Sequence, residues 1–358
     1  MASTVGPQQS VWSERDTSPG KIEEALRRLL FELHGQDSGY VAGRALNMVC
    51  VVDREWSGEI VNRLDRTGRF HPSRTIILAV EPRRTTIDAM ATVGSEGGPA
   101  DAEFTLLRET VQVWVGERHL THLDSIVDPL VVTDLPTVLW SPHGHPEAVD
   151  NLLGLVQVVL VDSVDEPDVR EALRRADELS HEGAYVVDLA WLRSTPWRER
   201  VAASFDPTIL RGELQQLTLV EVRHHERSRA AGLLLLGWLC SRLGWRTDGL
   251  LPHGEELRGR AHGRRQDVDV RLVVDREQTV PGLSGLTVET ATGRHLALDR
   301  GPGGLQAHYR NRRGDERRWA VVGASRGEAG ILGEGIRQAL LRDPTYAPAL
   351  ACATTLAS

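Results

Sequence analysis

Cysteine is scarce in this 358-residue sequence, and lysine is nearly absent, with Lys21 as the single example. The three cysteines, Cys50, Cys240 and Cys352, are too few and too widely spaced for a disulfide framework or a cluster of metal ligands. Cys50 and Cys240 lie in apolar segments and are predicted to be buried thiols. Cys352 lies near the C-terminus, in a stretch predicted to be a polar tail, and is the one thiol expected to meet an oxidant.

Long apolar runs are also missing. The most apolar stretch, residues 233–240, is far too short to cross a bilayer, and the N-terminus has no signal-peptide pattern. These features predict a soluble cytoplasmic protein. The formal net charge of −8 argues against a general nucleic-acid or anionic-membrane binder, although local basic patches remain compatible with that average.

The length and the apolar fraction of 41% predict two ordinary domains, each with its own core. Residues 45–52 and 75–80 are apolar runs of strand length, separated by a helical pattern over 57–64, as expected for a parallel β-α-β unit. We therefore expect a flexible tail over 1–17 and an α/β domain with a mixed, largely parallel sheet over 18–206.

The pattern changes after residue 207. Helices are expected over 214–222 and 230–243, followed by a solvated, arginine-rich loop over 252–267. Short alternating segments separated by glycine and proline turns then predict an antiparallel meander, closed by a helix over 331–341. We therefore expect an α+β domain with an antiparallel sheet over 207–345 and a tail over 346–358.

The densest segment is YVVDLAWLRSTPWRERVAASFD, residues 185–206, which we call the corner segment. Asp188 ends a short apolar strand. Thr195 is expected to be a helix N-cap, with Pro196 at the first helical position, where its missing N–H costs nothing. The segment contains two indoles and several arginines. One hypothesis is that the two indoles pack in a domain core. Protein-binding surfaces are also enriched in tryptophan and arginine, so an interface is the other.

DLAWLRSTPWRE followed by FD resembles the signature D-L-A-W-x-R-x-T-x-W-R of the glucose-6-phosphate dehydrogenase assembly protein (OpcA) family. Three further stretches agree in order: residues 43–46, His71-Pro72-Ser73-Arg74, and residues 134–140. The resemblance covers roughly residues 40–245. Ser141 departs from the pattern, because relatives often have a second tryptophan there.

The resemblance implies a non-catalytic cytoplasmic partner of glucose-6-phosphate dehydrogenase, with no cofactor and no bound metal. Such a partner promotes assembly of the active oligomer or activates it allosterically, and so controls NADPH supply in the oxidative pentose phosphate pathway. The implied contact residues are those that match the motifs: Asp188, Trp191, Arg193, Thr195, Trp197 and Arg198, followed by Arg44, His71, Arg74, Asp134 and Trp140.

Two alternatives remain open on the sequence. Arg44, His71 and Arg74 are expected at one edge of the first sheet, where they could hold a phosphate or carboxylate and make the protein a sensor of sugar phosphates or nucleotides. An unrecognised hydrolase or transferase is the other, although no Gly-x-Ser-x-Gly elbow supports a nucleophile at Ser73. The pair His143 and His145 lacks the further ligands that zinc needs.

Overall fold

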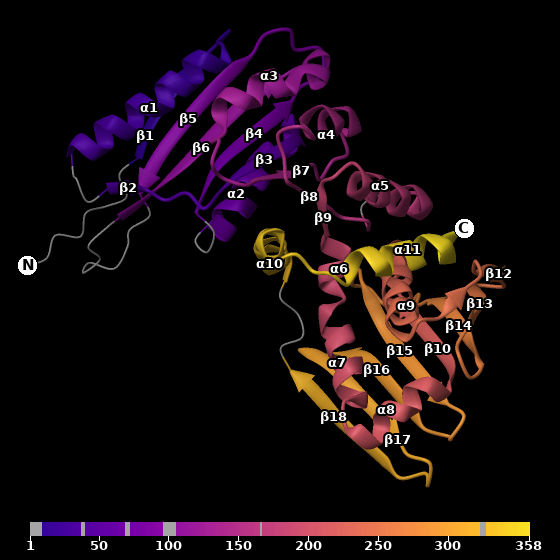
Figure 1. Ribbon diagram of the computed structural model, residues 1–358. Coiled ribbons are helices and arrows are strands. Elements are labelled where there is room, and N and C mark those ends of the chain that lie inside the picture. The colour runs from indigo at the N-terminus through magenta and orange to yellow at the C-terminus, as the bar shows by residue number, and fades with distance from the viewer. Residues whose placement is uncertain (1–8, 37–39, 69–71, 96–104, 165–166, 323–326) are drawn as a thin grey trace, which may run out of the picture. The chain divides into compact units, whose positions relative to one another are not determined.

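The computed structural model describes residues 9–36, 40–68, 72–95, 105–164, 167–322 and 327–358 (Figure 1). The chain divides into two compact units. The first comprises the chain up to Val161 together with Gly183–Val186, and the second comprises Asp162–Glu182 and Val187–Ser358. This division falls earlier in the chain than the predicted boundary after residue 206, because most of the corner segment belongs to the second unit.

The first unit is built on a sheet with the strand order β1-β5-β6-β4-β3-β7-β8-β9, and β2 pairs with β6. The pairs β3–β4, β3–β7, β4–β6, β7–β8 and β2–β6 are parallel, whereas β1–β5 and β5–β6 are antiparallel. The strands are β1 (Gln9–Glu14), β2 (Tyr40–Ala42), β3 (Leu46–Asp53), β4 (Ser73–Val80), β5 (Asp88–Ser95), β6 (Thr105–Val115), β7 (Thr137–Trp140), β8 (Val158–Val161) and β9 (Tyr185–Asp188).

Helices cover this sheet because β3 and β4 are apolar along nearly their whole length and must be buried on both faces. The helix α1 contacts β5, and α2 contacts β3 and β4. The helices and 3₁₀ turns are α1 (Pro19–Gln36), η1 (Arg54–Trp56), α2 (Ser57–Gly68), η2 (Glu117–His122), α3 (Leu123–Val127), η3 (Asp128–Leu130) and α4 (Pro146–Leu152).

The second unit contains a sheet with the order β11-β13-β14-β10-β15-β16-β17-β18, and β12 pairs with β13. Its pairs are antiparallel except β10–β14, which is parallel, so the sheet differs from the purely antiparallel one expected. The strands are β10 (Leu217–His224), β11 (Arg246–Thr247), β12 (Leu251–His253), β13 (Glu256–His262), β14 (Asp267–Val274), β15 (Leu283–Thr290), β16 (His295–Gly301), β17 (Gly304–Arg310) and β18 (Glu316–Val322).

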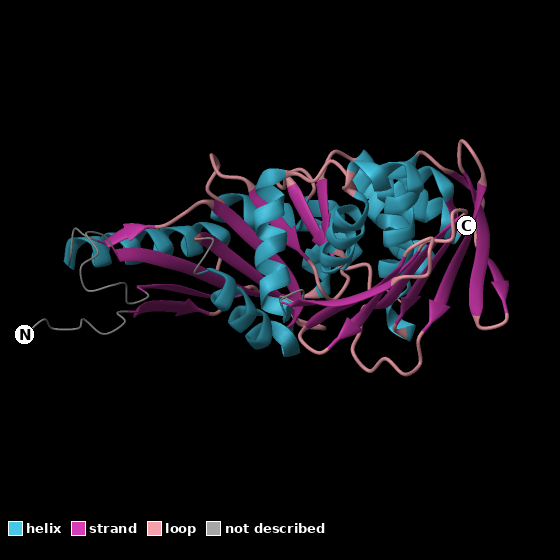
Figure 2. Ribbon diagram, turned by 90° about the horizontal axis from the view of Figure 1, so that it is seen from below, coloured by secondary structure: helices cyan, strands magenta, loops and turns pink. Residues whose placement is uncertain are grey.

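Helices of the second unit gather over one face of its sheet (Figure 2). The helix α9 contacts β10 and β14, and α11 contacts α9 and α5. The close approach of α9 to α11 requires glycine at Gly237, because a Cβ there would lie 2.2 Å from the carbonyl oxygen of Ala349. The helices and turns are α5 (Val169–His181), α6 (Leu189–Arg193), α7 (Thr195–Phe205), α8 (Thr208–Arg211), η4 (Gly212–Gln216), η5 (Glu226–Ser228), α9 (Arg229–Leu243), α10 (Gly327–Leu341) and α11 (Tyr346–Ala357).

The prediction of a two-sheet α/β protein is confirmed, and most of the expected strands and helices are present with shifted ends. The predicted type of secondary structure was wrong for two segments. The segment expected as a helix over 214–222 begins in η4 and continues as the central strand β10 from Leu217, in which Val220, Val222 and His224 alternate on the buried face. The expected loop over 252–267 contains most of β12 and all of β13, in which the exposed Arg258 and Arg260 alternate with less exposed neighbours, whereas Arg264 and Arg265 lie in the turn after β13.

Both predicted tails also contain regular structure. Within the N-terminal segment, Gln9–Glu14 forms the strand β1, which pairs along its whole length with β5. The sequence analysis did not predict this strand. The C-terminal segment forms α11, whose small apolar residues Ala349 and Ala353 are fully buried against α9. Cys352 accordingly lies half-buried in a helix, whereas Cys50 and Cys240 are buried as predicted. Burial raises the pKa of Cys240 to about 12, and the neighbouring Cys352 adds to this shift.

Candidate functional site

The corner segment begins with β9, which ends at Asp188, a fully buried carboxylate that caps α6. Its side chain accepts hydrogen bonds from the backbone N–H of Ala190 at 2.8 Å and of Ser163 at 3.2 Å. The hydroxyls of Ser163 and Tyr346 also donate to it. Burial, together with the nearby charge of Asp162, raises the pKa of Asp188 to about 6, although the hydrogen bonds oppose this shift.

The start of α7 differs in detail from the expectation. The N-cap is Ser194 rather than Thr195, and its side chain makes no capping hydrogen bond. The hydroxyl of Ser194 instead donates to the carbonyl of Trp191 at 2.7 Å, and Pro196 is the second residue of α7, one position later in the helix than predicted. Because Ser194 both ends α6 and begins α7, the two short helices follow each other without a loop.

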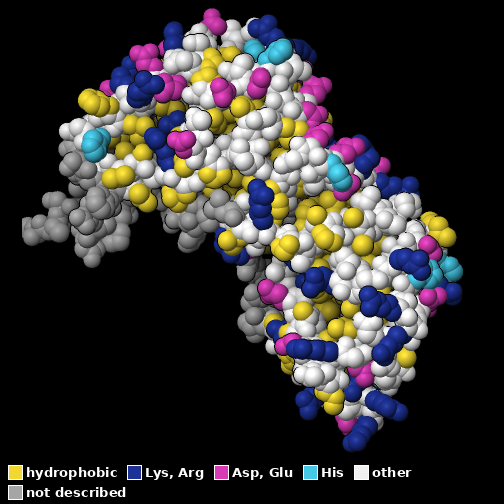
Figure 3. Space-filling model, in the orientation of Figure 1, with side chains coloured by type: hydrophobic (Ala, Val, Ile, Leu, Met, Phe, Trp, Pro, Cys, Tyr) yellow, Lys and Arg dark blue, Asp and Glu magenta, His cyan; other side chains and the backbone are white. Residues whose placement is uncertain are grey.

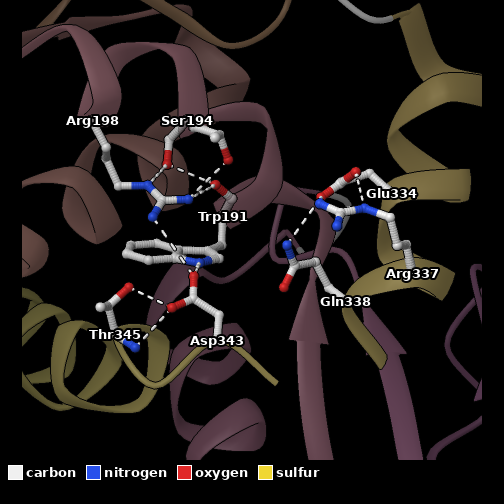
Figure 4. A network of polar contacts seen from close by, with 9 residues as sticks. Trp191, Ser194, Arg198, Glu334, Arg337, Gln338, Asp343 and Thr345 are labelled. Carbon is white, nitrogen blue, oxygen red and sulfur yellow. Dashed lines mark hydrogen bonds and ion pairs between the residues drawn. The ribbon is translucent and has the colours of Figure 1, made fainter. Parts of the chain in front are cut away.

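Trp191 is the centre of a network that joins the corner segment to the start of α11 (Figure 4). The guanidinium of Arg198 lies 3.5 Å from the centroid of the indole ring, a cation–π contact. The indole N–H donates to Asp343 at 2.9 Å. The ring of Tyr346 packs against the indole at 5.7 Å between centroids. The indole of Trp191 is therefore fixed by three contacts: the cation of Arg198 on its face, the carboxylate of Asp343 at its N–H, and the ring of Tyr346.

Arg198 is bound tightly within this network. It donates to the hydroxyls of Ser194 at 3.1 Å and of Thr195 at 2.9 Å, and its charge lies 3.8 Å from Asp343. Burial lowers the pKa of Arg198 to about 10, against the opposing attraction of Asp343. The guanidinium therefore stays charged at neutral pH, and its hydrogen-bonding capacity is directed inward.

Asp343 is the acidic counterpart of Arg198. The backbone N–H and the hydroxyl of Thr345 donate to its side chain at 2.8 Å and 2.6 Å. Burial tends to raise the pKa of Asp343, but the hydrogen bonds from Thr345 and Trp191 outweigh it, so the pKa is lowered. Asp343 follows Arg342, which has a left-handed backbone with φ of 53°. This tight connection between α10 and α11 presents the carboxylate to the indole.

Five of the six predicted corner residues make the polar contacts around Trp191 and Asp188, and Trp197 is the sixth. Arg193 makes a bidentate ion pair with Asp162, at 2.8 Å and 2.7 Å, beside the Asp188 cluster. Trp197 is also buried, with 3% of its surface exposed, but it contributes to the apolar face that it shares with Val201 and Phe205. The two indoles are thus buried side chains of the second unit, as in the hypothesis that the corner segment packs them in a core.

Sequence reasoning missed the residues that complete the corner: Asp162, Ser163, Asp343, Thr345 and Tyr346. The last three lie in a stretch expected to be the end of a domain and a tail. A signal was present, because Asp343-Pro344-Thr345 before an apolar segment is a typical helix-start sequence. Which partner such a helix start would meet could not be deduced from spacing.

A second set of predicted residues lies in the first unit and centres on Glu109 of β6, which is 1% exposed. Arg74 donates to Glu109 through Nε at 2.8 Å and to the carbonyl of Leu130 at 3.0 Å. Arg44 donates to the other oxygen of the same carboxylate. Both arginines thus share one carboxylate of the chain itself, so part of the positive charge expected to hold a phosphate at this edge is already compensated. His71 lies outside the described residues.

The remaining predicted residues, Asp134 and Trp140, do not join either cluster. Asp134 is exposed after η3, whereas Trp140 is buried at the end of β7, with Arg63 lying 5.3 Å over its ring. Beyond β7, the ring of His145 lies 2.9 Å from Asp53. Among the described residues, no group of three or more histidine, cysteine or acidic side chains is arranged to hold a metal ion. No helix in the described part of the chain is long and apolar enough to cross a membrane.

Two family profiles match the chain over most of its length. Residues 65–178 match the glucose-6-phosphate dehydrogenase subunit N-terminal domain of OpcA, and residues 184–350 match its C-terminal domain. The chain belongs to the OpcA family. The boundary between the two matches falls just before β9, close to the division between the compact units, and the corner segment lies within the C-terminal match.

Curated relatives agree with this OpcA membership. The chain is 30% identical over 129 residues to a protein of Nostoc punctiforme named as a provisional OxPP cycle protein OpcA, covering 35% of the chain and 28% of the relative. A protein of the same name from Synechococcus elongatus is 26% identical over 183 residues, covering 50% of the chain and 40% of the relative. The matched part of this chain thus spans less than half the length of these relatives.

Solved structures resemble this OpcA family member only distantly. An oxidoreductase from Bacillus cereus has a TM-score of 0.43 and 11% identity, covering 85% of this chain and 94% of that one. The WlbA dehydrogenase from Thermus thermophilus, solved with NAD and alpha-ketoglutarate, has a TM-score of 0.44 and 14% identity, covering 87% and 95%. At these TM-scores, the likeness carries no conclusion about what the chain binds or does.

Proposed function

We propose that this chain is a non-catalytic protein that binds glucose-6-phosphate dehydrogenase in the cytoplasm and favours its active oligomer. In this role it would control NADPH production in the oxidative pentose phosphate pathway. The observation that carries the proposal is that both halves of the chain match domains described as belonging to a glucose-6-phosphate dehydrogenase subunit.

The chemistry of the motif residues supports a structural and binding role rather than catalysis. Three charged residues of the corner segment that match the family motif are engaged within the unit: Asp188 by four donors, Arg193 by Asp162, and Arg198 by Ser194, Thr195 and Asp343. A catalytic acid, base or nucleophile needs an open approach to a substrate. Groups that are satisfied internally instead fix the geometry of the surface around them.

We divide the predicted contact residues by their exposure. Asp188, Trp191, Trp197 and Trp140 are buried, and we propose that they hold the surface in shape without contacting the enzyme. Asp134 is exposed, and the side chain of Arg193 is 23% exposed. Among the predicted residues that the structure describes, these two, with Thr195 and Arg44 at partial exposure, are the members that can reach a partner.

The mechanism rests on linkage. A protein that binds the active oligomer more tightly than the inactive form shifts the population towards that oligomer, by no more than the difference between the two binding free energies. The chain needs no group that touches the substrate, because the enzyme keeps its own active site. Activation therefore rises with the concentration of the chain and reaches a plateau.

The test uses purified dehydrogenase from the same organism, with NADPH formation and sedimentation velocity measured at increasing concentrations of the full chain. We expect higher activity together with a shift of the dehydrogenase to a larger sedimenting species. Asp134→Lys is expected to weaken activation, whereas Glu182→Lys, an equal charge change at an exposed position after α5, is the control. If neither activity nor sedimentation changes with the wild-type chain, the proposed function is wrong.

A further inference from the structure

The free edge of the second sheet differs sharply from its opposite edge. At the β13 side, the sheet ends in β11 and β12, strands of two and three residues. Such short strands are a common protection against unwanted strand pairing. At the other side, β18 is seven residues long and pairs only with β17 in the described part of the sheet. Its residues Glu316–Ala320 are all exposed, so nothing in the described chain covers this edge.

The hairpin that leads into β18 is strongly basic, in contrast to the net charge of −8 for the whole chain. Five arginines occur within residues 310–318 (RNRRGDERR), and dark blue side chains gather at this tip of the second unit in Figure 3. Only Arg318 has an ion-pair partner among the described residues, Glu316 at 3.6 Å. The other four are Arg310, Arg312, Arg313 and Arg317. A cluster of unpaired cations is complementary to an anionic partner.

The shape of the hairpin adds a second observation. Arg312 and Arg313 line a shallow, open hollow with Asn311 and with Arg294 of β15–β16, and its volume is about 530 Å³. On the strand itself, Trp319 is 38% exposed. Arginine on an edge strand can serve simply to prevent aggregation. That role requires neither an arginine-lined hollow beside the strand nor an exposed indole upon it.

We propose that the hairpin and the edge of β18 bind an extended acidic segment of a partner protein, which adds to the second sheet as a further strand. The backbone N–H and C=O groups on the free side of β18 would pair with the segment, as in other cases of strand addition. Carboxylates of the segment would meet Arg312, Arg313 and Arg317, and an apolar side chain would pack on Trp319. The inference concerns the chemistry of the segment and does not depend on which protein carries it.

The test begins with a displayed library of random dodecapeptides selected on the full-length chain. We expect enrichment of acidic peptides, and the affinity of the best peptide is then measured by fluorescence anisotropy. The double variant Arg312→Glu and Arg313→Glu should weaken binding about tenfold or more, because attraction becomes repulsion. Arg264→Glu with Arg265→Glu is the matched control. These two arginines are exposed in the turn between β13 and β14, and their reversal should leave the affinity unchanged.

A backbone test separates strand addition from simple charge attraction. The selected peptide is N-methylated on alternate residues in two registers, because only every second N–H of an added strand faces its neighbour. One register should abolish binding, and the other should leave it nearly intact. The proposal is overturned if no acidic peptide is enriched, if both double variants bind alike, or if both methylated peptides bind like the parent. Circular dichroism of both variants confirms that a loss of binding is not a loss of fold.

Discussion

Replacement of Asp188 by asparagine tests the most unusual electrostatic feature of the corner. The carboxylate is fully buried, and its pKa is raised to about 6 from a reference value of 3.8. Between these two pH values, the folded protein holds the proton more tightly than the unfolded chain. The contribution of Asp188 to stability is therefore greatest below about pH 4 and falls as the pH rises through 6.

The size of this effect follows from the shift. A difference of about two pH units, at about 1.4 kcal/mol per unit, corresponds to about 3 kcal/mol of unfolding free energy between pH 4 and pH 7. Asparagine has nearly the same shape and no charge to desolvate. Its oxygen can accept from Ala190 and Ser163 N–H, and its amide can donate to the hydroxyls of Ser163 and Tyr346. The variant should therefore gain stability relative to wild type as the pH rises through this window.

The assay is urea denaturation of wild type and Asp188→Asn at a series of pH values from 4 to 7.5. The quantity compared is the difference in unfolding free energy between the two proteins, which cancels the titration of all other groups. Asp206→Asn, at an exposed position at the end of α7, is the control and should show a constant difference. Parallel pH profiles for wild type and Asp188→Asn would refute the assignment of a raised pKa to this carboxylate.

Two further substitutions probe the two clusters. Glu109→Ala should destabilise the protein by about 3–5 kcal/mol, because it leaves the buried guanidinium of Arg74 without its carboxylate. Urea denaturation measures this loss of stability, and a loss below about 1 kcal/mol would contradict a buried ion network. Trp191→Phe keeps a ring beneath Arg198 but removes the N–H that donates to Asp343, and should cost about 1–3 kcal/mol. Trp191→Ala should cost more, about 3–5 kcal/mol, and equal losses for the two variants would show that the hydrogen bond to Asp343 contributes nothing.

Much of the fold could be predicted where one periodicity dominates over a sufficient length. The apolar runs of β3 and β4 and the helix α9 are unambiguous in this respect. The strand β10 was wrongly predicted as a helix because polar positions such as Glu221 also fit a helix, and only the pairing with β14 and β15 decides the matter. The small residues of α11 have no strong amphipathic pattern, since the helix is buried through close approach to α9 rather than through large side chains.

The sequence signature located the candidate site but did not predict the physical role of its residues. Tryptophan and arginine side by side are compatible both with an interface and with a cation–π contact in a core. The sequence could not distinguish these because the deciding partner, Asp343, lies 152 positions beyond Trp191. Likewise, Arg44 and Arg74 suggested an anion site, and an anion is indeed present there. It is Glu109, whose position on the adjacent strand β6 could be found only from the sheet register.

The length of chain closed by the corner has a kinetic consequence. The hydrogen bonds from Trp191 to Asp343 and from Tyr346 to Asp188 span 152 and 158 positions, and the whole sheet of the second unit lies between their partners in the sequence. Contacts of such separation form late, after the loop-closure entropy has been met by nearer pairings. We therefore expect substitutions in this corner to accelerate unfolding while leaving the refolding rate nearly unchanged.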